Sequence, residues 1–145
     1  MHADPVGTTT ASMIVELEAD PSAPVLAWMT LGNPCVATYF PVFADVEPPT
    51  ELLQGNDDPA SGGAWWRFRE LLLEVQKDFP RRGQYVRGFW SEFERELVAG
   101  TLRDVSRLPG PGMERRRAQE HVQQRAWEKV STALAGLAGR VRGLA

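Results

Sequence analysis

The chain has 145 residues, of which 43% are hydrophobic, and its 16 Lys and Arg against 19 Asp and Glu leave a net charge of −3. This length is that of one domain, and the composition excludes disordered, collagen-like and disulfide-stapled proteins. A lone cysteine, Cys35, excludes an internal disulfide, and the sequence has neither a secretion signal nor a run of roughly 18 apolar residues, so we expect a cytoplasmic protein with no membrane segment.

Acidic and basic residues are divided between two parts of the chain. Residues 1–60 carry nine acidic residues and no Lys or Arg, whereas residues 61–145 carry all 16 basic residues and ten acidic ones. Between positions 48 and 63, the Pro, Gly, Asn and Asp residues are typical of a linker. We therefore predict a strand-rich acidic segment over 1–47, a linker loop over 48–63 and a helical segment over 64–145.

Short antiparallel strands, beginning with a β-hairpin, are predicted within about residues 8–44. In residues 12–18, Val15 and Leu17 alternate with Glu16 and Glu18. This alternation, together with a high density of β-branched residues, is typical of a strand with one face in the core and one in solvent.

Two further extended segments follow. Residues 25–31 are apolar almost throughout, which suits a strand covered on both faces better than an edge strand. Residues 20–24 form the turn that joins it to the first strand. A third segment over 36–43 contains Pro41, whose missing N–H excludes a central position in the sheet.

The second part of the chain has helical spacing of its apolar residues and predicts three helices, at about 63–79, 83–100 and 112–138. We expect Pro80 to end the first helix and Gly100 to lie near the end of the second. Glycines at the end of the third helix predict fraying there. Strands followed by helices indicate an α+β fold.

This layout leaves part of the predicted sheet without cover. Three helices cover one face of a sheet of two or three strands, but hardly two faces. The apolar segment over 25–31 therefore indicates that further strands are missing. Two alternatives remain, in which the helices wrap both faces or the chain dimerises through its sheet.

Residues that could carry chemistry are few. His2 and His121 are the only histidines, and with Cys35 they suggest no metal site, no cofactor site and no catalytic group. The arginines are interleaved with acidic residues in a chain of pI about 5.4, so we expect no nucleic-acid partner. An alternative is cleavage before Thr8, which would expose a threonine nucleophile with a free α-amine as its base.

Several short motifs occur in a characteristic order along the chain. They are Met1–Asp4, Thr8–Met13, Val25–Trp28, Gly32–Cys35 and Phe40–Phe43, followed by Trp65–Trp66 and an Arg- and Glu-rich last helix. Together they resemble the C-terminal third of the secernins and their bacterial dipeptidase relatives, which are N-terminal-nucleophile cysteine hydrolases. The resemblance covers nearly all of this chain but only the last part of a family member.

The resemblance implies a four-layer αββα fold in which a processed N-terminal cysteine attacks an amide, typically that of a dipeptide, without a metal. No position here matches that cysteine, which lies upstream of the region corresponding to Met1, and Cys35 has no catalytic counterpart. We therefore expect residues 1–145 to be a partial domain that is inactive alone and takes a dipeptide-like substrate only when completed by an N-terminal part. The candidate pocket-lining residues are Thr8, Thr9, Thr10 and Ser12.

A rival hypothesis needs no missing part. In it, the chain is a stand-alone α+β interaction module that dimerises, or binds a partner, through the edge of its sheet.

Overall fold

The computed structural model describes residues 2–3, 7–55 and 58–144 and shows an α+β chain in which strands precede helices, as predicted. The strands are β1 (His2–Ala3), β2 (Gly7–Thr8), β3 (Ala11–Glu16), β4 (Leu26–Leu31) and β5 (Phe40–Phe43). The helices are α1 (Thr50–Leu53), a 3₁₀ turn (Pro59–Ser61), α2 (Ala64–Gln76), α3 (Phe79–Val105) and α4 (Met113–Arg142).

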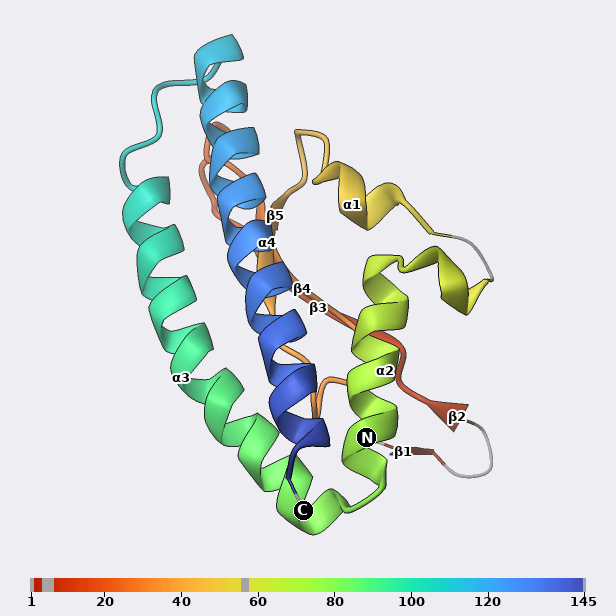
Figure 1. Ribbon diagram of the computed structural model, residues 1–145. Coiled ribbons are helices and arrows are strands. Elements are labelled where there is room, and N and C mark those ends of the chain that lie inside the picture. The colour runs from red at the N-terminus through yellow and green to blue at the C-terminus, as the bar shows by residue number, and fades with distance from the viewer. Residues whose placement is uncertain (1, 4–6, 56–57, 145) are drawn as a thin grey trace.

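The helices form a layer on one side of a small sheet (Figure 1). The long helix α4 lies between α3 and α2, and it also packs against β5. The sheet has three antiparallel strands in the order β3-β4-β5, and β1 and β2 form a separate hairpin. β4 is central and not an edge strand, as its apolar sequence predicts, but the helical layer covers only one of its two faces.

The core lies between the helices and one face of β4 and β5. The register pairs Met29 with Phe40 and Ala27 with Val42, so these four side chains share a face. Phe40 packs edge-to-face against Trp127 of α4, with ring centroids 5.2 Å apart. Buried side chains from all three long helices complete this core, including Phe68, Leu71 and Val75 of α2, Val86 and Trp90 of α3, and Val130, Leu134 and Leu137 of α4.

Hydrogen bonding explains why β5 tolerates a proline. The Ala44 amide donates to the Val25 carbonyl at 3.1 Å. Because successive residues of a strand direct their N–H groups to opposite sides, the register places the nitrogen of Pro41 on the side away from β4. Pro41 therefore removes no bond from the ladder, and β5 is an edge strand as predicted. On the same outer side, the Phe43 amide donates to Gln123 Oε1 of α4 at 3.1 Å.

The predicted boundary between the first two helices is wrong. α2 ends at Gln76, and Pro80 lies in the first turn of α3, where a proline needs no hydrogen-bonded N–H. The side chain of Asp78 caps α3 by accepting from the Arg81 amide at 3.3 Å. Pro80 is compatible with either the end or the start of a helix, and the preceding Asp78 is the feature of the sequence that indicates a start.

Both long helices also run beyond their predicted ends. α3 reaches Val105 instead of stopping near Gly100, and α4 reaches Arg142 instead of fraying after residue 138. Thr101 in α3 and Val141 in α4 are buried, so tertiary packing outweighs the low helix propensity of the glycines.

Two other predicted segments also differ from the structure. The predicted linker loop over 48–63 contains α1 and the 3₁₀ turn. The third extended segment is shorter than predicted, because only Phe40–Phe43 is a strand.

Gln123 of α4 satisfies the outer side of β5, and its removal should destabilise the fold. Both Phe43 and Gln123 are buried, so Gln123→Leu leaves the Phe43 N–H without its acceptor. We expect the free energy of unfolding to fall by about 1–3 kcal/mol, measured by urea denaturation. The neighbouring Gln124 is half-buried and donates to Glu128 Oε1 on the exposed side of α4, so Gln124→Leu should change the free energy of unfolding by less than about 0.5 kcal/mol. Equal effects of the two substitutions would contradict this role.

Candidate functional site

The outer strand β3 carries apolar side chains into solvent on both of its faces. Met13 is 60% exposed, Ile14 57% and Val15 40%, and Leu17 just after the strand is 78% exposed. Met13 and Ile14 point to opposite faces because successive residues of a strand alternate. The prediction that Val15 and Leu17 face a core is therefore wrong. Their alternation with glutamates belongs to a strand that the helical layer does not cover.

The backbone of β3 is paired on one side only. The Gly32 amide donates to the Thr10 carbonyl at 2.7 Å, and the register then turns the peptide groups of every second residue, Ser12, Ile14 and Glu16, toward β4. Those of Ala11, Met13 and Val15 consequently point to the outer side. Within residues 2–3, 7–55 and 58–144, no backbone group pairs with this outer side.

An apolar groove lies at the start of this strand. Its volume is about 680 Å³, and it is lined by Leu31, Leu52, Leu53, Gln54, Gly55, Gly63, Trp65 and Trp66. The two indole rings meet edge-to-face with centroids 4.6 Å apart, and Trp65 Nε1 donates to the Thr10 carbonyl at 3.2 Å. The groove therefore joins the N-terminal end of β3 to α1 and α2. The two consecutive tryptophans are the feature of the sequence that could have indicated this groove. The short helix α1, which lines its other side, has no such feature.

The predicted pocket-lining residues lie in β2, in β3 and in the segment between them. Thr8 belongs to β2, Thr9 is half-buried and Thr10 is exposed. Ser12 lies in β3, where its Oγ accepts from the Tyr39 hydroxyl at 3.0 Å. Thr10 contacts the groove through its carbonyl group, which accepts from Trp65 Nε1.

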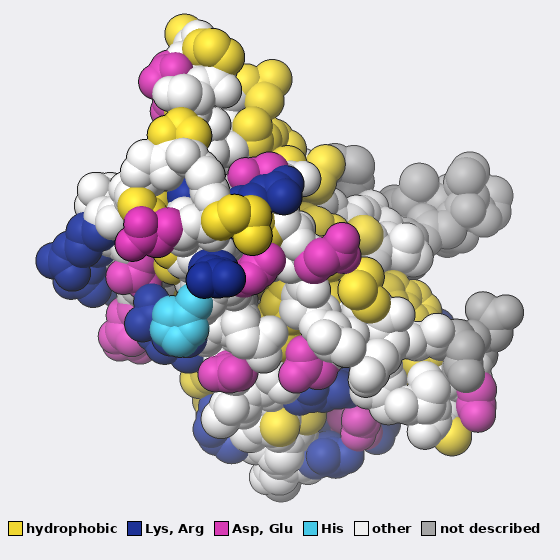
Figure 2. All heavy atoms as spheres, turned by 90° about the horizontal axis from the view of Figure 1, so that it is seen from above, with side chains coloured by type: hydrophobic (Ala, Val, Ile, Leu, Met, Phe, Trp, Pro, Cys, Tyr) yellow, Lys and Arg dark blue, Asp and Glu magenta, His cyan; other side chains and the backbone are white. Residues whose placement is uncertain are grey.

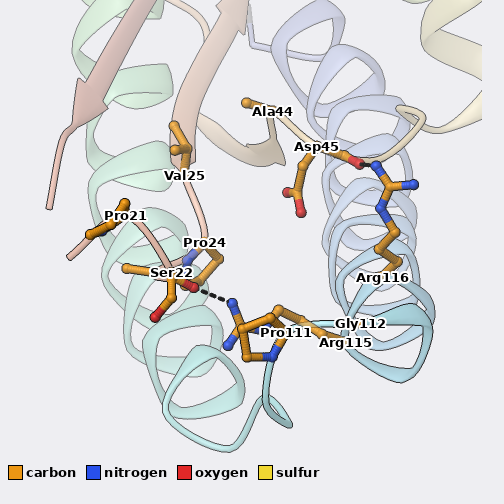
Figure 3. Close-up of a pocket in the computed structure, with 11 residues that line it drawn as sticks. Pro21, Ser22, Pro24, Val25, Ala44, Asp45, Pro111, Gly112, Arg115 and Arg116 are labelled. Atoms are coloured by element: carbon orange, nitrogen blue, oxygen red, sulfur yellow. Dashed lines mark hydrogen bonds between the residues drawn. The ribbon is translucent and has the colours of Figure 1, made fainter.

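A second cavity, of about 420 Å³, lies between the β3–β4 turn, the end of β5 and the start of α4 (Figure 3). Two arginines of α4 line it. Arg115 donates to the Ser22 carbonyl and Arg116 donates to the Asp45 carbonyl at 2.8 Å. Both guanidinium groups are thus used to hold the strand segment against α4. We assign this cavity a structural role.

Two carboxyl groups have a lowered pKa, and both lie away from the outer side of β3. The amide and hydroxyl of Ser22 lower the pKa of Asp20 in the β3–β4 turn. The Lys77 ammonium lowers that of Glu74, at 2.7 Å. Each contributes stability above the pKa of the unfolded carboxyl group and loses it as the pH falls through the lower, folded value.

The remaining sequence candidates lie in three different parts of the fold. Cys35 is half-buried against the core, and its amide donates to Asn33 Oδ1 at 2.9 Å. His121 is exposed on α4, and His2 lies in β1. Among the described residues, no group of three or more His, Cys, Asp or Glu side chains could hold a metal ion. In the same part of the chain, no helix has the length and apolar character needed to span a bilayer.

The surface charge is mixed. Figure 2 shows Lys and Arg side chains interspersed with Asp and Glu, and hydrophobic side chains gathered toward the upper end of that view.

Comparison with known proteins finds no matching family model and no match among curated proteins. The candidate site therefore rests on the geometry of β3 and its neighbouring groove.

Proline should destabilise the fold less at a position of β3 whose N–H faces outward than at one whose N–H faces β4. The N–H of Met13 faces outward, so Met13→Pro should lower the free energy of unfolding by less than about 1 kcal/mol, since an edge strand tolerates proline there. The N–H of Ile14 faces β4, so Ile14→Pro should lower it by about 2 kcal/mol or more through loss of a ladder bond. Chemical denaturation measures both. A reversed order would show that the outer side has been assigned wrongly.

Proposed function

We propose that this chain is the C-terminal portion of a secernin-like cysteine dipeptidase, in which further strands complete the sheet along the outer side of β3. The observation that carries the proposal is a strand whose outward peptide groups and apolar side chains are both exposed. An edge of this kind is unfavourable in a finished sheet because it invites pairing with another strand.

The layering of the chain supports the same proposal. Helices α2, α3 and α4 cover one side of the sheet, as the outer helical layer of an αββα fold would. The sheet itself has only three strands, fewer than most sheets that are stable within a domain. Additional strands would cover Met13, Ile14 and Val15, which together expose a large apolar area.

In this proposal the chain supplies structure, and the nucleophile comes from the added strands. The resemblance implies a cysteine at a processed N-terminus, whose α-amine accepts the thiol proton before the sulfur attacks the amide carbonyl. The groove beside Trp65 and Trp66 lies at the end of β3, and an apolar side chain of a small peptide would fit its lining. The Thr10 backbone links that groove to the sheet.

Complementation tests the proposal. We expect the chain alone to hydrolyse no dipeptide, and co-expression with the N-terminal part of a secernin-like cysteine dipeptidase to restore hydrolysis. Activity should disappear when the nucleophilic cysteine of that part is replaced by alanine, which excludes contaminating peptidases. Met13→Pro in this chain should lower the restored activity at least about tenfold, because it removes an outward donor. A purified complex without hydrolysis would contradict the proposal.

The second candidate function is a stand-alone module that dimerises, or binds another protein, through the same edge. The observation that favours it is the chain's own core, in which Trp127, Phe68 and Leu134 are almost completely buried. A chain with such a core has the packing needed for cooperative unfolding.

Light scattering after size-exclusion chromatography tests the module. A stable dimer that Met13→Pro converts to a cooperatively melting monomer would support self-association through β3. Aggregation, or a species that binds a hydrophobic dye without a sharp melting transition, is the result expected of an incomplete sheet and would count against the module.

A further inference from the structure

The outer side of β3 also indicates what kind of strand it accepts. We propose that its partner is an extended segment with a continuous apolar run of about six residues and with Lys or Arg at the end that lies beside Glu16 and Glu18. This inference rests on the proposed completion of the sheet through β3, and it adds the chemistry of the completing strand.

The length of the partner follows from the backbone. Three residues of β3, namely Ala11, Met13 and Val15, turn their peptide groups outward. Because outward groups recur at every second residue, a partner that satisfies them extends at least from Ala11 to Val15, which is nearly the whole length of β3. A shorter segment would leave outward groups of Ala11 or Val15 without a partner.

The apolar character of the partner follows from the side chains. Met13 and Val15 are exposed on the face that continues the helix-covered side of β4, and Ile14 is exposed on the opposite face. A neighbouring strand places its side chains beside these on both faces. An alternating polar and apolar partner would cover one face only, so the complementary strand is apolar throughout its centre.

The charge of the partner follows from the end of β3. Glu16 and Glu18 are exposed, and neither carboxylate forms an ion pair with a described residue. No Lys or Arg occurs in residues 1–60, so this segment has no basic side chain of its own to place there. A second copy pairing through its own β3 would bring no positive charge. A separate basic strand therefore fits better than self-pairing.

Binding of short peptides to the complete chain tests this inference. The probe is a fluorescein-labelled peptide with six alternating Val and Ile residues and two Lys at one end, prepared with the lysines at the N-terminal or the C-terminal end. Matched peptides carry Glu in place of Lys. In fluorescence anisotropy at low salt, the better Lys peptide should bind about tenfold more tightly than its Glu counterpart, and the ratio should shrink as salt is added.

Three variants separate the contributions. Met13→Pro should weaken Lys-peptide binding at least about tenfold while leaving the circular dichroism spectrum unchanged, because the lost donor faces outward. The double variant Glu16→Gln and Glu18→Gln should remove the preference for Lys over Glu. Glu128→Gln, on the exposed side of α4, is the matched control and should leave that preference unchanged.

Two results would overturn the inference. One is equal binding of Lys and Glu peptides at low salt, and the other is Lys-peptide binding that Met13→Pro does not weaken. A homodimer that excludes both peptides would assign the edge to a second copy and would also overturn it. Peptide binding requires no hydrolysis. Failure of complementation with intact Lys-peptide binding would therefore reject the dipeptidase proposal alone.

Discussion

Every β-strand carries hydrogen-bonding groups along both of its sides, and the two outer sides of this sheet are satisfied differently. On β5, Pro41 has no N–H to offer and the Phe43 amide donates to Gln123 of α4. On β3, the groups of Ala11, Met13 and Val15 point outward without a partner in the described part of the chain. This asymmetry gives the sheet one closed edge and one edge ready to accept a strand.

The helical layer explains why the closed side is stable. α4 packs between α3 and α2 and also reaches β5, where Trp127 contacts Phe40. The side chains of Arg115 and Arg116 hold the β3–β4 turn and the end of β5 against the start of the same helix (Figure 3). The helix α4 therefore packs against α2, α3 and β5 on the closed side. The apolar side chains of β3 are not covered by it and lie in solvent.

The open edge of β3 has an apolar groove near one end and two exposed acidic residues at the other. The groove at Trp65 and Trp66 meets the start of the strand, and Glu16 and Glu18 lie at its other end. In the proposed secernin-like dipeptidase, the nucleophile would arrive on strands added along this edge. The interaction module explains the edge with a separate partner, and strand pairing is common to both hypotheses.

The sequence by itself determined the order of strands and helices, the central place of residues 26–31 and the edge position of Pro41, because these follow from local periodicity and from the chemistry of proline. Only the tertiary structure decided where the helices end, since burial of Thr101 and Val141 outweighs nearby glycines. It also decided that the apolar side chains of β3 are exposed to solvent. Alternation predicts that a strand has a core face, but whether a helix lies over that face depends on residues distant in the sequence.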